Sequence, residues 1–204
     1  MLVVDDDDAM RFVAMDTLQD AGFNVVEAVD GEDALKKFNR YQPDLVLLDL
    51  MMPVVDGYEV CSRIRSMQGS ENVPIMIMTG LDDAESINRA FDAGATDFIT
   101  KPLNHLILEQ RTRYILRTST ILKTLEQRES RLENAERIAK LGSWSWDTRD
   151  RKIHVSKEFK RILDFPDDST PTLHEIYSKF SQEEKNRVLQ IYQKAIDSKE
   201  KSLV

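Results

Sequence analysis

Short, mostly apolar runs alternate with helical patterns through the first half of the chain, and this alternation constrains the fold more than any other feature. The runs are Leu2–Val4, Asn24–Ala28, Leu45–Leu48, Ile75–Met78 and Asp97–Ile99. Because they lack a regular polar alternation, they indicate strands that are buried on both faces. Strands of this kind, separated by helices, predict an α/β fold built on a parallel sheet.

Helical periodicity fills the gaps between these runs. It extends over Ala9–Ala21, Asp33–Tyr41, Tyr58–Met67 and Ala84–Ala93. In the first of these helices we expect Phe12, Val13 and Leu18 to share one buried side. Five strands with intervening helices predict a doubly wound sheet of flavodoxin-like order, 2-1-3-4-5, whose ligand crevice lies beside strands 1 and 3.

Polar side chains stand where four of the predicted strands end. Asp5 and Asp6 follow the first strand, Asp49 ends the third, Thr79 closes the fourth, and Lys101 follows the fifth. Each residue alone is a weak signal, since an aspartate after a strand is commonly a turn or helix cap. Because the carboxyl ends of parallel strands meet at one edge of the sheet, we expect all five side chains to converge there.

Three carboxylates at one edge would repel one another strongly unless a cation lay among them. Mg²⁺ prefers oxygen ligands and keeps several of its waters. We therefore predict a magnesium site in which Asp6 and Asp49 are direct ligands and Asp5 binds through water. The backbone carbonyl of Met51 is expected to supply a further oxygen.

A carboxylate in such a site can act as the nucleophile in phosphoryl transfer, and we assign that role to Asp49. Proteins catalyse phosphoryl transfer chiefly by positioning the groups and by supplying cations. Lys101 offers a positive charge to one phosphate oxygen, and the Thr79 hydroxyl can donate a hydrogen bond to another. Asp49, Thr79 and Lys101 are therefore the predicted catalytic residues.

Residues 104–141 contain neither Pro nor Gly, and apolar residues recur among them at heptad intervals. The repeat comprises Leu108, Ile115, Leu122, Leu125, Leu132 and Ala139, while Thr118, Glu129 and Glu136 occupy the remaining seam positions. We interpret residues 105–140 as a helix that leaves the first domain and forms a parallel coiled coil in a homodimer. The alternative is a single linker helix that packs back on a neighbouring domain.

The character of the chain changes after Gly142. Ser143–Asp147 and Lys152–Val155 are typical of strands, and Ser156 is placed to cap a helix that runs to about Asp164. Capping-box spacings begin at two further positions, Thr172 and Ser181. Because two strands form only a marginal sheet, residues 141–204 are predicted to be an incomplete α+β segment.

Charge is distributed unevenly between the two halves of the chain. Residues 1–104 hold 20 acidic and 8 basic residues, and residues 105–204 hold 16 acidic and 20 basic. Neither half has the basic density of a phosphate-backbone groove, so we expect no nucleic-acid partner. No apolar run reaches the ~18 residues of a membrane span, so no membrane contact is expected. The single Cys61 fits a reducing, cytoplasmic location.

Several short motifs in the first half occur together in one known family. They are Leu2–Asp6, Leu47–Pro53, Asp56-Gly57, Thr79-Gly80, Gly94-Ala95 and Lys101-Pro102. On these motifs residues 1–118 resemble a response-regulator receiver domain of two-component signalling. The resemblance implies a signalling switch rather than an enzyme, although one that assists its own phosphorylation.

The resemblance carries further expectations for individual residues. Asp49 would accept phosphate from a histidine kinase, and the Lys101–Pro102 bond would be cis. Phe98 would turn inward as the Thr79 hydroxyl moves to the phosphate. A different reading is a phosphatase that uses Asp49 transiently, but haloacid-dehalogenase-like phosphatases place an acid–base Asp where this chain has Met51.

Residues 135–204 resemble the start of a PAS sensor domain, and the stretch Ile138–Asp147 carries that resemblance. Proteins that join a receiver, a helix and a PAS domain resemble the front ends of cyclic-di-GMP enzymes or of hybrid histidine kinases. The resemblance therefore implies that a catalytic output domain lies beyond Val204.

Overall fold

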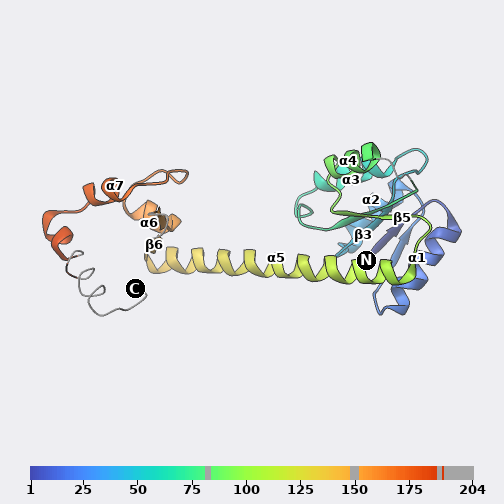
Figure 1. Cartoon of the computed structure of the whole chain (residues 1–204), viewed down its shortest axis with the longest axis horizontal. Helices are drawn as coiled ribbons and strands as arrows, with labels where there is room; N and C mark the ends of the chain where they lie inside the picture. The colour runs from blue at the N-terminus through green and yellow to red at the C-terminus, as the bar shows by residue number, and fades with distance from the viewer. Residues whose placement is uncertain (81–83, 148–151, 188–189, 191–204) are drawn as a thin grey trace. The chain divides into compact units, whose positions relative to one another are not determined.

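The computed structural model describes residues 1–80, 84–147, 152–187 and 190 (Figure 1). The chain forms two compact units, Met1–Leu125 and Glu126–Val204, which are described separately. No helix among the described residues is both long enough and apolar enough to cross a membrane.

The first unit alternates strands and helices as the sequence predicts. In chain order its elements are β1 (Leu2–Val4), α1 (Asp8–Asp20), β2 (Val26–Ala28), α2 (Gly31–Tyr41), β3 (Val46–Asp49), α3 (Gly57–Arg65), β4 (Ile75–Thr79), α4 (Ala84–Asp92), β5 (Asp97–Thr100) and the first part of α5 (His105–Ala139). The strands have three to five residues each, at the short end of the usual range.

The five strands form one sheet in the order β2-β1-β3-β4-β5, and every neighbouring pair is parallel. This confirms the predicted flavodoxin-like arrangement. The register aligns Val4 with Leu48 and Asp49 with Met78, so the strands end at nearly the same level. Loops that follow β1, β3, β4 and β5 therefore share one edge of the sheet.

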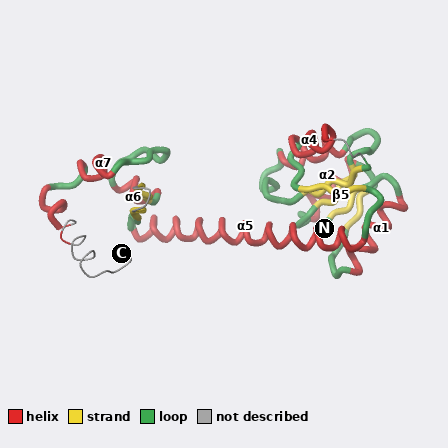
Figure 2. The backbone as a smooth tube through the Cα atoms, in the orientation of Figure 1, coloured by secondary structure: helices red, strands yellow, loops and turns green. Residues whose placement is uncertain are grey.

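Alternate strand residues point to opposite faces of the sheet and build two apolar clusters. Leu48 and Ile77 face the cluster to which α2, α3 and α4 contribute, whereas Leu47 and Met76 face the one that contains residues of α1 and α5. Figure 2 shows the strands between helices on both sides. Helices on two faces explain why these strands carry no polar alternation.

The buried side of α1 differs from the predicted one. Phe12 is 68% exposed, whereas Arg11, Ala14 and Leu18 are buried. The three buried residues follow the i, i+3, i+7 spacing of one helix face, and Arg11 remains on it because its guanidinium group is fully engaged. The expectation that Phe12 packs with Leu18 was wrong, because hydrophobicity alone gave the phenylalanine priority.

The start of α5 packs on the first unit through Leu108, Thr112 and Ile115, which are buried. In the second unit, β6 (Trp144–Asp147) and β7 (Lys152–Val155) pair in an antiparallel manner. They are followed by α6 (Lys157–Ile162), which Ser156 caps, and α7 (Leu173–Ser178), which opens with a capping box at Thr172. The cap predictions at Ser156 and Thr172 are thus confirmed, while the PAS assignment of this unit stays a prediction.

Candidate functional site

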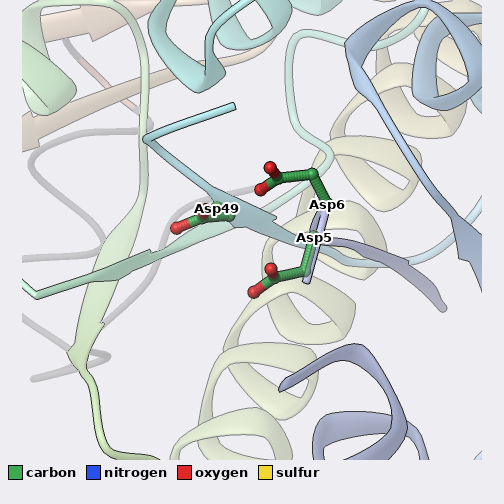
Figure 3. Close-up of side chains that lie close together, drawn as sticks. All are labelled: Asp5, Asp6 and Asp49. Atoms are coloured by element: carbon green, nitrogen blue, oxygen red, sulfur yellow. The ribbon is translucent and has the colours of Figure 1, made fainter. Parts of the chain in front are cut away.

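The acidic residues predicted to converge do lie together at the carboxyl edge of the sheet (Figure 3). One carboxylate oxygen from each of Asp5, Asp6 and Asp49 lies within 4.8 Å of the other two. Asp5 and Asp49 are buried, whereas Asp6 is exposed. The cluster therefore has a closed floor and an open side from which a small ion or a phosphoryl donor can approach.

Lys101 provides the counter-charge for the two buried carboxylates. Its Nζ lies 2.9 Å from Asp49 Oδ1 and 2.9 Å from Asp5 Oδ2. Burial alone lowers the pKa of Lys101, but the close contacts and charge attraction of Asp49 and Asp5 outweigh burial and raise the pKa. The lysine is therefore a fixed positive charge at neutral pH.

The ionised form of Asp49 remains disfavoured in spite of this lysine. Burial is the largest influence and raises the pKa of Asp49, and the negative charge of Asp5 raises it further. The hydrogen bond and charge of Lys101, together with a hydrogen bond from the Met51 N–H, lower the pKa but do not cancel the rise. Burial prevails because one lysine is shared between two carboxylates. A second cation at this position would relieve the remaining cost.

Asp5 shows directly where such a cation would fit. Its Oδ1 accepts a hydrogen bond from the Asp7 N–H at 2.9 Å. Its Oδ2 is buried and receives no aligned hydrogen bond, so its contact with Lys101 is only an ion pair. A buried carboxylate oxygen with unused acceptor capacity, next to two more carboxylates, matches the hard oxygen ligands that Mg²⁺ prefers.

Thr79 ends β4 beside this cluster. It is buried and follows Met78, the register partner of Asp49. Its carbonyl oxygen accepts the Lys101 N–H at 2.8 Å, so the ends of β4 and β5 are joined by their backbones. The Lys101–Pro102 peptide bond is cis, as the receiver resemblance implied.

Phe98 lies one strand away from the acidic cluster, on β5. It is partly buried, and its ring meets Phe91 edge to face at a centroid distance of 6.3 Å. The Arg111 guanidinium lies 5.8 Å from the Phe98 ring and donates a hydrogen bond to the Phe98 carbonyl oxygen. The side chain thus links α4, β5 and α5, which is the position a conformational relay would need.

The start of α3 fixes the backbone that carries Asp49. The Gly57 N–H donates to the Leu50 carbonyl at 3.0 Å, and Asp56 caps the helix by accepting from the Glu59 N–H. A Cβ atom on Gly57 would lie 2.2 Å from the Asp49 carbonyl oxygen. Only glycine allows this approach, so the Asp56-Gly57 pair positions the acidic residue as well as the helix.

Sequence reasoning missed Arg11. Its Nη1 donates to the Asp5 carbonyl oxygen at 2.8 Å, its Nε donates to Glu27 at 2.9 Å, and its Nη2 contacts Asp8. The side chain therefore holds the loop that presents Asp5. The available signal was its spacing, since Arg11 stands three and seven residues before Ala14 and Leu18.

Comparison with known proteins agrees with this geometry. Residues 1–113 match the model of the response regulator receiver domain family. A five-stranded 2-1-3-4-5 sheet with an acidic cluster and a lysine at its carboxyl edge defines a protein of the response-regulator class. The chain belongs to the response regulator receiver domain family.

Several relatives share this domain. The chemotaxis protein CheY4 of Vibrio cholerae is 32% identical over 56% of this chain and 95% of its own, with a TM-score of 0.54. RpaA of Synechocystis, a DNA-binding dual master transcriptional regulator, is 38% identical over 57% of this chain and 48% of its own. PhoP of Bacillus subtilis, a transcriptional regulatory protein for alkaline phosphatase synthesis, is 38% identical over 59% of this chain and 50% of its own.

These relatives correct one expectation. The prediction that the chain has no nucleic-acid partner is contradicted, because two of these relatives, RpaA and PhoP, are transcriptional regulators and RpaA is named as DNA-binding. The inference used only the net charge summed over each half of the chain, and such a sum does not exclude a nucleic-acid partner. The chain spans about half the length of these curated relatives.

Proposed function

We propose that Asp49 is the phosphoacceptor of a two-component response regulator, with the phosphohistidine of a sensor histidine kinase as donor. A carboxylate oxygen of Asp49 attacks the phosphorus, the phosphorus–nitrogen bond breaks, and the histidine nitrogen leaves and takes up a proton. The observation that carries this proposal is the buried Asp49 beside Asp5, with one lysine shared between them. A phosphoryl group on Asp49 would lie next to the Lys101 ammonium group and could enter from the side of the exposed Asp6.

Asp6 and Asp49 would hold a Mg²⁺ ion directly, with Asp5 through water and the Met51 carbonyl as a further ligand. When bound, Mg²⁺ supplies positive charge that stabilises the equatorial oxygens of the transferring phosphoryl group. Lys101 leaves the Asp49 oxygen that becomes bonded to phosphorus and pairs with a phosphoryl oxygen instead. The Thr79 hydroxyl donates to another oxygen.

Movement of Thr79 and Lys101 would then shift the ends of β4 and β5. Phe98 would turn inward, and its contacts with Phe91 and Arg111 would carry the change to α4 and α5. Because α5 extends to Ala139, the change would reach the dimer formed by residues 105–140 and a PAS-like output module in the cytoplasm. The chain acts as a switch in this scheme, not as an enzyme with turnover.

A direct test uses acetyl phosphate as donor with the full chain in Mg²⁺. We expect up to one phosphoryl group per wild-type chain by intact mass, and none with the metal chelated. Asp49→Asn should incorporate none, while Asp20→Asn, on the exposed end of α1, should match the wild type. Equal incorporation by Asp49→Asn would refute the assignment. A phosphatase would instead turn over p-nitrophenyl phosphate, and we expect no turnover.

A second candidate for the output is control of transcription, which the names of the relatives favour. In that case phosphorylation would change the affinity of the regulator for DNA. Fluorescence anisotropy with labelled genomic fragments, before and after acetyl phosphate treatment, measures this. A phosphorylation-dependent rise in anisotropy supports the candidate, and an unchanged signal counts against it.

A further inference from the structure

An apolar stripe on α5 lies open to solvent in the part of the helix that follows its contact with the sheet. Ile121, Leu125 and Leu132 are 52%, 55% and 64% exposed. Surface leucines and isoleucines occur singly on most proteins, but these recur at spacings of four and seven residues. A heptad spacing fits another helix of the same pitch better than any flat surface.

The structure removes several residues from the seam that the sequence suggested. Leu108 and Ile115 belong to the apolar cluster of the first unit and are buried against the sheet. They are therefore unavailable to a partner. Thr112, on the same side of the helix, is buried as well.

Another part of that seam is occupied within the second unit. Glu136, which is a position of that seam, accepts a hydrogen bond at Oε1 from Ser143 Oγ at 2.5 Å, and Glu133, which lies beside the seam, has its Oε1 2.9 Å from Lys157 Nζ. Both glutamates are partly covered, whereas Leu132 and Ala135 remain exposed. Glu136 therefore fits the edge of a helix pair better than its core.

A second seam replaces Leu122, Glu129 and Glu136 by the residue that precedes each of them. It avoids both the residues buried against the sheet and Glu136. Its positions are Thr118, Ile121, Leu125, Arg128, Leu132, Ala135 and Ala139, with steps of three and four residues. All of these are exposed. We infer that a second copy of this chain packs in parallel against this seam; the inference rests on the homodimer of the proposed function and specifies its register.

Charges beside the seam select the parallel orientation. Arg117 and Arg131 occupy g positions, while Glu129 and Glu136 occupy e positions. A parallel pair places g beside e, so Arg131 of one copy lies beside Glu136 of the second copy, where Oε2 is the carboxylate oxygen not used by Ser143. An antiparallel pair would place arginines beside arginines and glutamates beside glutamates, which is unfavourable.

The first unit leaves room for the partner where the seam begins. A hollow of about 510 Å³ is lined by Tyr114, Thr118 and Leu122 of α5 and by Pro74 and Asp97 of the first unit, among other residues. Tyr114 stands four residues before Thr118 and is 71% exposed. Thr118, the first position of the seam, therefore borders this hollow.

Arg128 is the weak point of the seam, because two guanidinium groups would face each other at its centre. Such a polar core position lowers the stability of a coiled coil. Arg128→Leu should therefore tighten the dimer by about tenfold in Kd. The adjacent Glu129→Leu distinguishes the two registers, since Glu129 is a core position only in the seam of Leu122 and Ile115.

The test is sedimentation equilibrium of the full chain. We expect Arg128→Leu to lower Kd, Glu129→Leu to leave it unchanged, and Leu132→Glu to abolish the dimer; Lys123→Glu, on the far side of α5, is the control. In a Cys61→Ala background, Ala135→Cys should form a disulfide between copies only in a parallel pair.

Tightening by Glu129→Leu rather than by Arg128→Leu would overturn this register. Dimers that survive Leu132→Glu, or chains that stay monomeric even with Arg128→Leu, would overturn the interface. Acetyl phosphate labelling of the same variants separates this inference from the phosphoacceptor assignment. Labelling should be unchanged in all of them, whatever the dimer does.

Discussion

At the scale of single residues, the site holds two buried carboxylates, Asp5 and Asp49, beside a single lysine. Asp5 and Asp49 share one lysine, and the Asp5 Oδ2 atom still has unused acceptor capacity. Buried carboxylates of this kind cost stability unless they are compensated. Under the proposed function, this cost would keep the position for a metal ion and a phosphoryl group.

Asp49→Asn should stabilise the metal-free protein at neutral pH by about 1 kcal/mol, since screening by water and Lys101 limits the gain. The pKa of Asp49 is raised by burial, so the folded chain binds this proton more tightly than the unfolded chain. Ionisation therefore costs wild-type stability as pH rises from 3.8 through the raised pKa. The gain should grow across this window and then level off.

Urea unfolding in chelator at a series of pH values measures this difference. Lys101 keeps its Asp5 partner in the variant, so no unpaired cation offsets the gain. Added Mg²⁺ should raise the unfolding free energy of the wild type and leave that of Asp49→Asn nearly unchanged. A variant less stable than the wild type at pH 7 without metal would contradict this stability cost of the buried carboxylates.

The sequence predicted the polar residues at the strand ends because parallel strands bring their carboxyl ends to one edge whatever the details of packing. Asp5, Asp6, Asp49 and Lys101 follow from that rule. Arg11 did not, because its role depends on a carbonyl oxygen of another segment, and no spacing rule encodes such a contact. The spacing of Arg11 with Ala14 and Leu18 indicates its buried face but not the groups that it binds.

At the scale of elements, the close approach of α3 to β3 determines where Asp49 points. The first residue of the helix, Gly57, donates its N–H to the Leu50 carbonyl oxygen just after the strand, and its missing side chain leaves room for the Asp49 carbonyl oxygen. The alternation of elements was predictable because continuous apolar strands and periodic helices have different spacings. The contact between α3 and β3 was not, because it is set by backbone distances.

Gly57→Ala should destabilise the protein by about 2 kcal/mol and reduce phosphoryl transfer, because the new methyl group would overlap the Asp49 carbonyl oxygen. Gly80→Ala is the matched control next to Thr79, since its added Cβ has no atom of the described residues within 4 Å apart from its chain neighbours. That change should stay within about 0.5 kcal/mol. Urea unfolding and acetyl phosphate labelling measure both effects, and equal outcomes for the two variants would remove the close-approach explanation.

At the scale of the whole molecule, one helix belongs to both units, and its faces have different tasks. Leu108 and Ile115 are committed to the sheet, while Leu125 and Leu132 are exposed. A heptad count alone placed all four in one seam, because it cannot tell a contact within the chain from a contact between chains. The long helix was predictable from the absence of Pro and Gly; its buried side required the structure.

The proposed switch depends on which carboxylate takes up the phosphoryl group, and borohydride trapping identifies that carboxylate most directly. The full chain is treated with acetyl phosphate and Mg²⁺, and borohydride then reduces the acyl phosphate, which converts that aspartate to homoserine. Peptide mass spectrometry should find homoserine at position 49 and nowhere else. Homoserine at Asp5, at Asp6 or outside the acidic cluster, with Asp49 unchanged, would contradict the account.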